Sequence, residues 1–228
     1  MDIKNKAFKD WMNFEKNLKY SNRFFIAPEF QNNLIRAIYL HSGELFKGKV
    51  LYRSRINDSE PFDKPIIIGK MGAPQNHKTF SNRANPKGIS YLYTSLNEPT
   101  CVNESKSGIG KYLTIAKFKL NHDIRIVDLY DAFPVQTDEY VNYLGFRLHT
   151  TFSKPIDYSK SDIEYLPYQF ISELIKRQNF HGVLYRSLFG KSSKSKDDSN
   201  LVLFNENLVT PDPKTYTVKI TEVSVSYV

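Results

Sequence analysis

Three arginines are the side chains of this sequence best suited to bind an anion. Arg53 and Arg55 lie on a predicted strand, and Arg83 lies on a long loop that follows it. A guanidinium group can donate two parallel hydrogen bonds to one phosphate, which a lysine cannot do. Taken one at a time, each arginine is equally compatible with an ordinary surface salt bridge.

A tyrosine and a glutamate follow these arginines in a stretch that changes from strand to helix. Tyr93 lies on the predicted strand, and Glu104 lies on a predicted helix that Asn97 can cap while Pro99 occupies its first turn. A later strand carries the pattern Gly-x-x-Tyr-x-Ser, which ends at Ser187. Together with the arginines, these residue types indicate chemistry on a dinucleotide.

For two other sets of residues, a catalytic interpretation competes with a structural one. Cys101 can be read as a nucleophile, but it falls on the apolar face of a short helix, where a single cysteine is usually a packing residue. Asp128 with Asp131, or Asp138 with Glu139, can be read as a carboxylate pair of the glycosidase type. Acidic pairs at strand ends more often cap helices or lie in solvated turns.

Several common motifs are absent from the sequence. The five histidines show no His-Glu-x-x-His spacing and no cysteine cluster, so no zinc site and no other metal is expected. No Gly-x-Gly-x-x-Gly turn follows a strand, and no P-loop motif is present. A lysine-rich loop at 191–196 permits nucleic-acid binding, but it contains no aromatic residue on which a base could stack.

The composition is that of a globular protein. The chain has 228 residues, of which 40% are hydrophobic and 14% aromatic, and its formal net charge is +8. A positive surface attracts phosphorylated ligands, nucleic acid or an acidic partner, and charge does not choose among them. One cysteine excludes an intrachain disulfide, and no apolar run is long enough to span a membrane. We therefore expect a cytoplasmic protein.

The expected elements begin with two amphipathic helices and continue with a β-rich region. Helical spacing of apolar residues predicts a helix over 4–19 and a second one from residue 28 to about residue 43, and the alternating stretch 49–56 predicts a strand. The loop at 58–85 is too long for an ordinary connection and is expected to cover a pocket. The remaining expectations are strands at 90–95, 112–119, 124–128, 181–187, 200–204 and 215–228, a helix at 162–178 and a mobile loop at 191–199.

Six separated segments, in this order, resemble the RES domain family, which is named for its Arg, Glu and Ser signature residues. The resemblance covers about residues 48–205, and residues 1–47 lie outside it. The six segments are Leu51–Arg55, Met71–Pro74, Asn82–Tyr93, Thr100–Glu104, Gly182–Ser187 and Asn200–Phe204.

This resemblance implies an α+β fold, similar to that of ADP-ribosyltransferase toxins, with a split β-sheet flanked by helices. It divides the chain into an N-terminal helical extension, 1–47, and a RES-like catalytic domain, 48–228. The resemblance assigns Arg53, Tyr93, Glu104 and Ser187 to catalysis, and Arg53, Arg83, Tyr93 and Asn200 to binding of NAD, with Arg55 ranked behind Arg53. One departure is that Asn82 precedes Arg83, where the family usually has glycine.

RES domains are known as toxins of toxin-antitoxin pairs that consume NAD, so the resemblance implies NAD as substrate and an Xre-like antitoxin as partner. The acceptor can be water, inorganic phosphate or a protein side chain, which leaves a glycohydrolase, a phosphorylase and an ADP-ribosyltransferase open. A non-enzymatic nucleic-acid-binding module that keeps only the scaffold is a further alternative. The two N-terminal helices are compatible with a homo-oligomer, with partner docking or with packing on the core.

Overall fold

The computed structural model describes residues 2–131, 133, 135–155, 161–188 and 195–223. Its strands are β1 (Ser42–Leu45), β2 (Val50–Ile56), β3 (Leu92–Ser95), β4 (Tyr112–Leu120), β5 (Ile124–Asp128), β6 (Gly182–Arg186), β7 (Ser199–Leu203) and β8 (Val209–Lys219). Its helices are α1 (Ile3–Tyr20), α2 (Pro28–Leu40), α3 (Glu98–Glu104), α4 (Glu139–Thr151), α5 (Ser161–Glu164) and α6 (Leu166–Arg177). Within this part of the chain, no helix is long and apolar enough to cross a membrane.

The strands form one sheet of eight in the described residues, in the order β1-β5-β6-β7-β3-β2-β4-β8. β5 and β6 pair in parallel, whereas the pairs on either side of them, β1 with β5 and β6 with β7, are antiparallel. β2 pairs with both β3 and β4, which holds the strand that carries Arg53 on two sides. The predicted α+β class, with helices beside a sheet and helices at the N-terminus, is confirmed.

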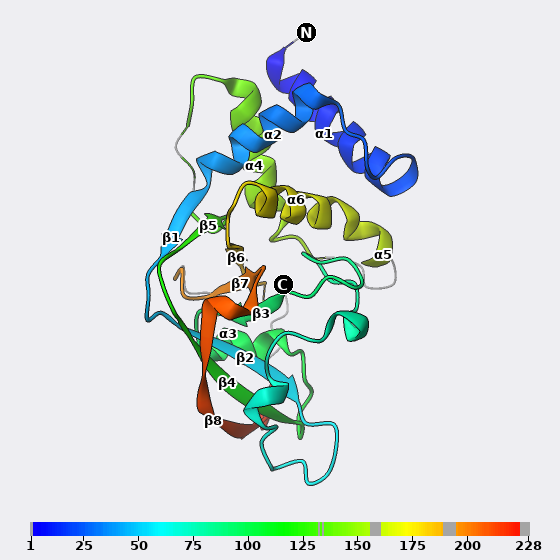
Figure 1. Cartoon of the computed structure of the whole chain (residues 1–228). Helices are drawn as coiled ribbons and strands as arrows, with labels where there is room; N and C mark the ends of the chain where they lie inside the picture. The colour runs from blue at the N-terminus through cyan, green and yellow to red at the C-terminus, as the bar shows by residue number, and fades with distance from the viewer. Residues whose placement is uncertain (1, 132, 134, 156–160, 189–194, 224–228) are drawn as a thin grey trace.

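Side chains alternate between two hydrophobic clusters on opposite faces of the sheet. Val183 and Val202 belong to the cluster that the helices cover, and their neighbours Leu184 and Leu203 belong to the other. Such alternation is the two-residue period of a strand buried on both faces. Figure 1 shows α1, α2, α4 and α6 grouped at one end of the molecule, with β2, β4 and β8 towards the other.

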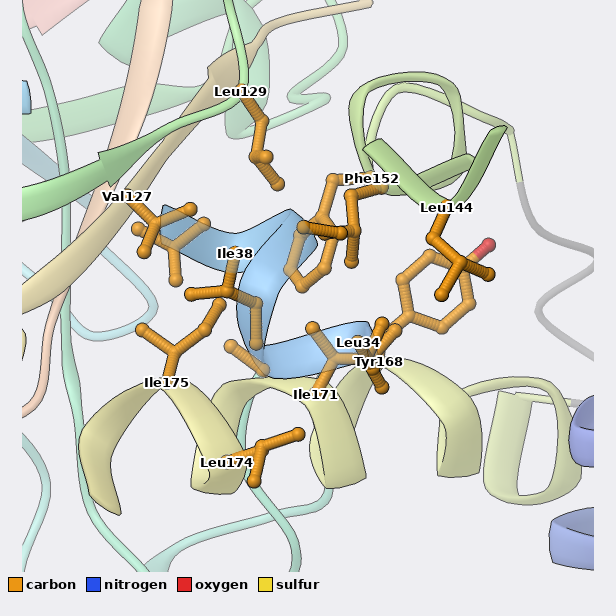
Figure 2. Close-up of a cluster of buried hydrophobic side chains, with 14 of the residues drawn as sticks. Leu34, Ile38, Val127, Leu129, Leu144, Phe152, Tyr168, Ile171, Leu174 and Ile175 are labelled. Atoms are coloured by element: carbon orange, nitrogen blue, oxygen red, sulfur yellow. The ribbon is translucent and has the colours of Figure 1, made fainter. Parts of the chain in front are cut away.

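The helices share one core with the sheet. Figure 2 shows Leu34 and Ile38 of α2 surrounded by side chains of α4, α6 and the end of β5, among them Phe152 and Ile171. Trp11 of α1 is fully buried in the same cluster. The two N-terminal helices therefore contribute to the core of the described chain, and whether residues 1–47 count as a separate extension stays a prediction.

The second N-terminal helix is shorter than its periodicity indicates. α2 ends at Leu40, and Ser42–Leu45 forms β1, so the expectation that the helix continues to Gly43 is wrong. The ring of His41 is buried, with Nδ1 3.1 Å from the carbonyl oxygen of Asp128 and Nε2 3.0 Å from that of Gly145. These contacts, together with pairing of β1 along β5, turn the chain into the sheet.

Helix α4 was not predicted from the sequence. Asp138 is its N-cap, since the carboxylate accepts hydrogen bonds from the backbone N–H groups of Tyr140 (3.0 Å) and Val141 (3.2 Å). This confirms the capping interpretation of the pair Asp138 and Glu139. The helix expected at 162–178 is divided into α5 and α6, and Pro167 lies in the first turn of α6.

The remaining expected elements are found with small shifts. The strands predicted near 90–95, 112–119, 124–128, 181–187 and 200–204 are β3, β4, β5, β6 and β7. The last β-rich run begins earlier than predicted, as β8 at Val209, and residues 224–228 lie outside the described residues. The same holds for residues 191–194 of the loop expected at 191–199.

Gly182 is expected to tolerate no side chain, because a Cβ there would overlap the carbonyl oxygen of Val202 on the paired strand. Gly182→Ala should lower the free energy of unfolding by about 1–3 kcal/mol, the usual cost of overpacking. Urea unfolding followed by circular dichroism would measure this. Gly69→Ala is the matched control, since nothing lies within 4 Å of a Cβ at that position. Equal stability of the two variants would contradict the prediction.

Candidate active site

A cavity of about 400 Å³ lies where β2, β3, α3 and the ends of β6 and β7 meet. Five of the predicted site residues line it, and these are Arg53, Arg83, Tyr93, Glu104 and Asn200. Ser187 does not line the cavity but donates a hydrogen bond to Glu104, which does. Arg55 does not line the cavity and donates instead to the carbonyl oxygen of Gly72. The structure thus brings together residues that are distant in sequence.

Helix α3 places Glu104 at the cavity. The side chain of Asn97 accepts a hydrogen bond from the N–H of Thr100 (2.7 Å), and Pro99 occupies the first turn, as predicted. The helix ends at Glu104, and Lys106 then adopts a left-handed backbone conformation with φ of 51°. The short helix therefore presents the glutamate from its last turn.

The carboxylate of Glu104 is held by two donors on one oxygen. Its Oε1 accepts a hydrogen bond from the hydroxyl of Ser187 (2.5 Å) and another from Nδ2 of Asn200 (2.6 Å). Nothing in the sequence indicated a base beside Ser187, and the structure places the carboxylate of Glu104 there. Asn200 in turn accepts a hydrogen bond on Oδ1 from the hydroxyl of Ser95 (2.9 Å).

Arg53 lies deep in the site. Its Nη1 donates to the carbonyl oxygen of Tyr93 (2.7 Å), and its Nε is buried without an acceptor among the described residues. Burial, followed by the nearby charge of Arg55, lowers the pKa of Arg53 to about 10, so the group stays charged at neutral pH. Arg55 donates from Nη2 to the carbonyl oxygen of Gly72 (2.9 Å) and does not line the cavity.

Arg83, which also lines the cavity, is held by backbone carbonyls. Nη1 donates to the carbonyl oxygen of Phe152, and Nη2 donates to that of Lys154 (2.9 Å), just beyond the end of α4. The guanidinium carbon lies 5.5 Å from the ring centroid of Tyr168 and 5.9 Å from that of Tyr185. Arg83 therefore joins its loop to α4 while it faces the cavity.

The loop before Arg83 closes without a glycine. The backbone of Asn82 does not adopt the left-handed conformation, and its N–H donates to the carbonyl oxygen of Asn85 (2.9 Å). From α6, Nε2 of Gln169 donates to the carbonyl oxygens of Asn82 (2.9 Å) and Asn85 (3.1 Å). Asparagine in place of the usual glycine is thus compatible with the turn. Of the long loop at 58–85, the part that lines the cavity is Asn82 and Arg83.

The hydroxyl of Tyr93 is part of the same loop anchor. It donates to Oδ1 of Asn85 (2.7 Å) and accepts from the N–H of Ala84 (3.1 Å). Burial raises the pKa of Tyr93, so the hydroxyl stays protonated. The ring therefore forms a fixed wall of the cavity.

Sequence reasoning missed several lining residues. Tyr165 and Tyr185 add aromatic surface, and Lys106 and Arg186 add positive charge. Burial lowers the pKa of Lys106. The nearby charge of Glu104 raises this pKa, and that of Arg83 lowers it further. Tyr185 and Arg186 lie inside the segment 182–187 that was already singled out, whereas Lys106 and Tyr165 carried no sequence signal.

The competing catalytic readings receive structural explanations. Cys101 is buried, and this burial raises the pKa of its thiol to about 11, which confirms the predicted packing role. Asp128 and Asp131 both form ion pairs with Lys196, the last residue of the lysine-rich loop. In the part of the chain that the structure describes, no group of three His, Cys, Asp or Glu side chains could hold a metal ion.

The residues that form this site lie within a segment that matches a known family model. The family model of the RES domain matches residues 51–221. A chain in the crystal structure of the M. tuberculosis MbcT-MbcA toxin-antitoxin complex is similar at 12% identity and a TM-score of 0.47, over 83% of this chain and 92% of that chain. No curated protein matches the sequence.

Tyr93→Phe should destabilise the protein, because it leaves the N–H of Ala84 and Oδ1 of Asn85 without their partner. We expect the free energy of unfolding in urea to fall by about 1–3 kcal/mol. Tyr91→Phe is the matched control, because the hydroxyl of Tyr91 is also buried but has no hydrogen bond among the described residues. The prediction is wrong if the two variants are equally stable.

The thiol of Cys101 should react slowly in the folded protein. With a pKa of about 11 in place of 9.0, the thiolate fraction at pH 8 is about 100-fold smaller. Iodoacetamide labelling followed by mass spectrometry would measure the rate, with the same protein in guanidinium chloride as the control. The rate should rise about 100-fold between pH 8 and pH 10, whereas an ordinary thiol with a pKa of 9.0 would rise only about tenfold and level off above pH 10.

Proposed function

The chain belongs to the RES domain family, and on this premise we propose that it is a toxin that consumes NAD by cleaving the bond between nicotinamide and ribose. The observation that carries the proposal is the surroundings of Glu104. Among the described residues that line the cavity, it is the one acidic side chain beside four cationic ones, which are Arg53, Arg83, Lys106 and Arg186. Such a site suits a ligand with phosphates and a developing positive charge.

Glu104 stabilises the transition state in this proposal. Cleavage releases neutral nicotinamide from a pyridinium while positive charge develops on the ribose. A fixed carboxylate beside the ribose interacts with that charge more strongly in the transition state than in bound NAD, and so accelerates the step. Both donors to Glu104 bind Oε1, and Oε2 is the oxygen we assign to the ribose and its hydroxyl groups.

Arg53 is the first ligand of the pyrophosphate. Its buried Nε has no acceptor among the described residues, and a phosphate oxygen would supply one. Arg83 also lines the cavity and attracts the phosphates, although its two terminal nitrogens donate to carbonyl oxygens of residues 152 and 154. Arg55 ranks behind both, because its hydrogen bond is made to Gly72, outside the cavity.

The aromatic walls accommodate the planar nicotinamide ring. Tyr93 is held by Asn85 and Ala84, so its ring can stack on the nicotinamide or on the attached ribose without reorganising. Ser187 and Asn200 both donate hydrogen bonds to Glu104, which favours a role through that carboxylate. The leaving group is already cationic, so the reaction needs no Lewis acid, and EDTA should leave turnover unchanged.

The acceptor is water or inorganic phosphate in this proposal, and depletion of NAD arrests growth. A toxin that consumes NAD needs an antitoxin in its own cell, and we propose an Xre-like partner whose acidic or C-terminal segment covers the arginines. A homo-oligomer through the N-terminal helices fits the same proposal. Transfer of ADP-ribose to a protein is the alternative, since it shares the first bond cleavage, and a tracer that stays in small molecules would exclude it.

Glu104→Gln should keep the shape of the site and lose catalysis. Removing the charge is expected to lower kcat by about 100–1,000-fold, the usual effect of losing one transition-state partner, with a smaller change in KM. NAD loss and product formation would be followed by chromatography, with and without phosphate, so that ADP-ribose or its 1-phosphate identifies the acceptor.

The matched control is Glu173→Gln, an exposed glutamate on α6 that should behave as the parent protein. Arg53→Ala should also lose activity, whereas Arg177→Ala on the exposed face of α6 should not. Intact NAD after incubation with the unmodified protein would contradict the proposed function. Full activity of Glu104→Gln would reject the role of this carboxylate.

A further inference from the structure

Ser95 is a buried polar residue that the proposed reaction leaves without a role. It ends β3, and its side chain is 3% exposed. β3 pairs with β7 so that Ser95 lies opposite Asn200, and its hydroxyl donates to Oδ1 of Asn200 at 2.9 Å. A buried hydroxyl of a residue that lines the cavity is thus hydrogen-bonded to a side chain that contacts Glu104.

The direction of this chain of hydrogen bonds is set by Glu104. An ionised carboxylate only accepts, so Asn200 must turn its Nδ2 towards Oε1, at 2.6 Å. Its Oδ1 then faces Ser95, whose hydroxyl must donate. The two contacts hold both ends of the amide of Asn200, and each hydrogen bond in the chain polarises the next towards the carboxylate.

We propose that Ser95 is a positioning residue that fixes Asn200 and, through it, Glu104. Without the hydroxyl, Oδ1 of Asn200 is buried without a donor, and the amide is held at one end instead of two. Glu104 then keeps the direct contact of Ser187 and loses the rigidity of its second partner. The inference rests on the proposed function, because it assigns Ser95 to the placement of the carboxylate that stabilises the transition state.

A double-mutant cycle on NAD cleavage tests this assignment, with Ser95→Ala, Asn200→Ala and the double variant. Ser95→Ala should lower kcat by about tenfold and change KM by less than about twofold, since the carboxylate acts in the transition state. Asn200→Ala should lower kcat by about 100-fold. In the double variant kcat should equal that of Asn200→Ala, because Ser95 acts only through Asn200.

Two further variants separate positioning from a general structural role. Ser95→Thr keeps the hydroxyl and should restore most of the lost kcat. Ser199→Ala is the matched control, because Ser199 is fully buried beside Asn200 and its hydroxyl has no hydrogen bond among the described residues. Thermal unfolding of every variant shows whether it is folded at the assay temperature.

The possible results decide between the two proposals. If the parent protein cleaves NAD but Ser95→Ala retains its kcat, the inference about Ser95 fails alone. The same conclusion follows if Ser95→Ala reduces kcat as much in the Asn200→Ala background as in the parent protein. If the parent protein leaves NAD intact, the proposed function fails, and the inference fails with it.

Discussion

The hydrogen bonding of one carboxylate is the constraint on which the site depends. Glu104 lies at the end of a short helix, and its Oε1 is reached by Ser187, just beyond β6, and by Asn200 of β7. A carboxylate removed from water is costly unless donors replace the lost hydration. These donors come from strands that the sheet places side by side, so the fold itself supplies what the charge requires.

The cationic groups around this carboxylate are held by the backbone. Arg53 donates to the carbonyl oxygen of Tyr93, and Arg83 donates to carbonyl oxygens beyond α4, and among the described residues neither forms an ion pair with a carboxylate. Their charge therefore remains available to a ligand, while carbonyl dipoles fix their positions. Burial of the Arg53 guanidinium has a free-energy cost, and the same burial lowers its pKa to about 10.

Local features of the chain were predictable, and tertiary ones were not. Asn97 and Pro99 mark the start of α3, and alternation marks β2, β4 and β5, because caps and strand periods act over a few residues. α4 was missed, although Asp138 caps it. Arg53 and Arg55 could not be separated by strand periodicity, because side chains two positions apart lie on the same face of a strand, and the hydrogen bond that distinguishes Arg55 is made to Gly72, 17 positions away. The contact of Ser187 with Glu104 joins segments 83 positions apart, which no periodicity reveals.

The N-terminal helices lie outside the matched family segment and still support one wall of the site. α1 packs on α4 and α6, and α2 packs on the same two helices, within one hydrophobic cluster. α6 holds the loop of Arg83 through Gln169, and the chain just beyond α4 accepts the hydrogen bonds of Arg83 itself. The position of the Arg83 guanidinium therefore depends on how firmly α4 and α6 are packed. Residues 1–47 contribute to the core in which these two helices pack.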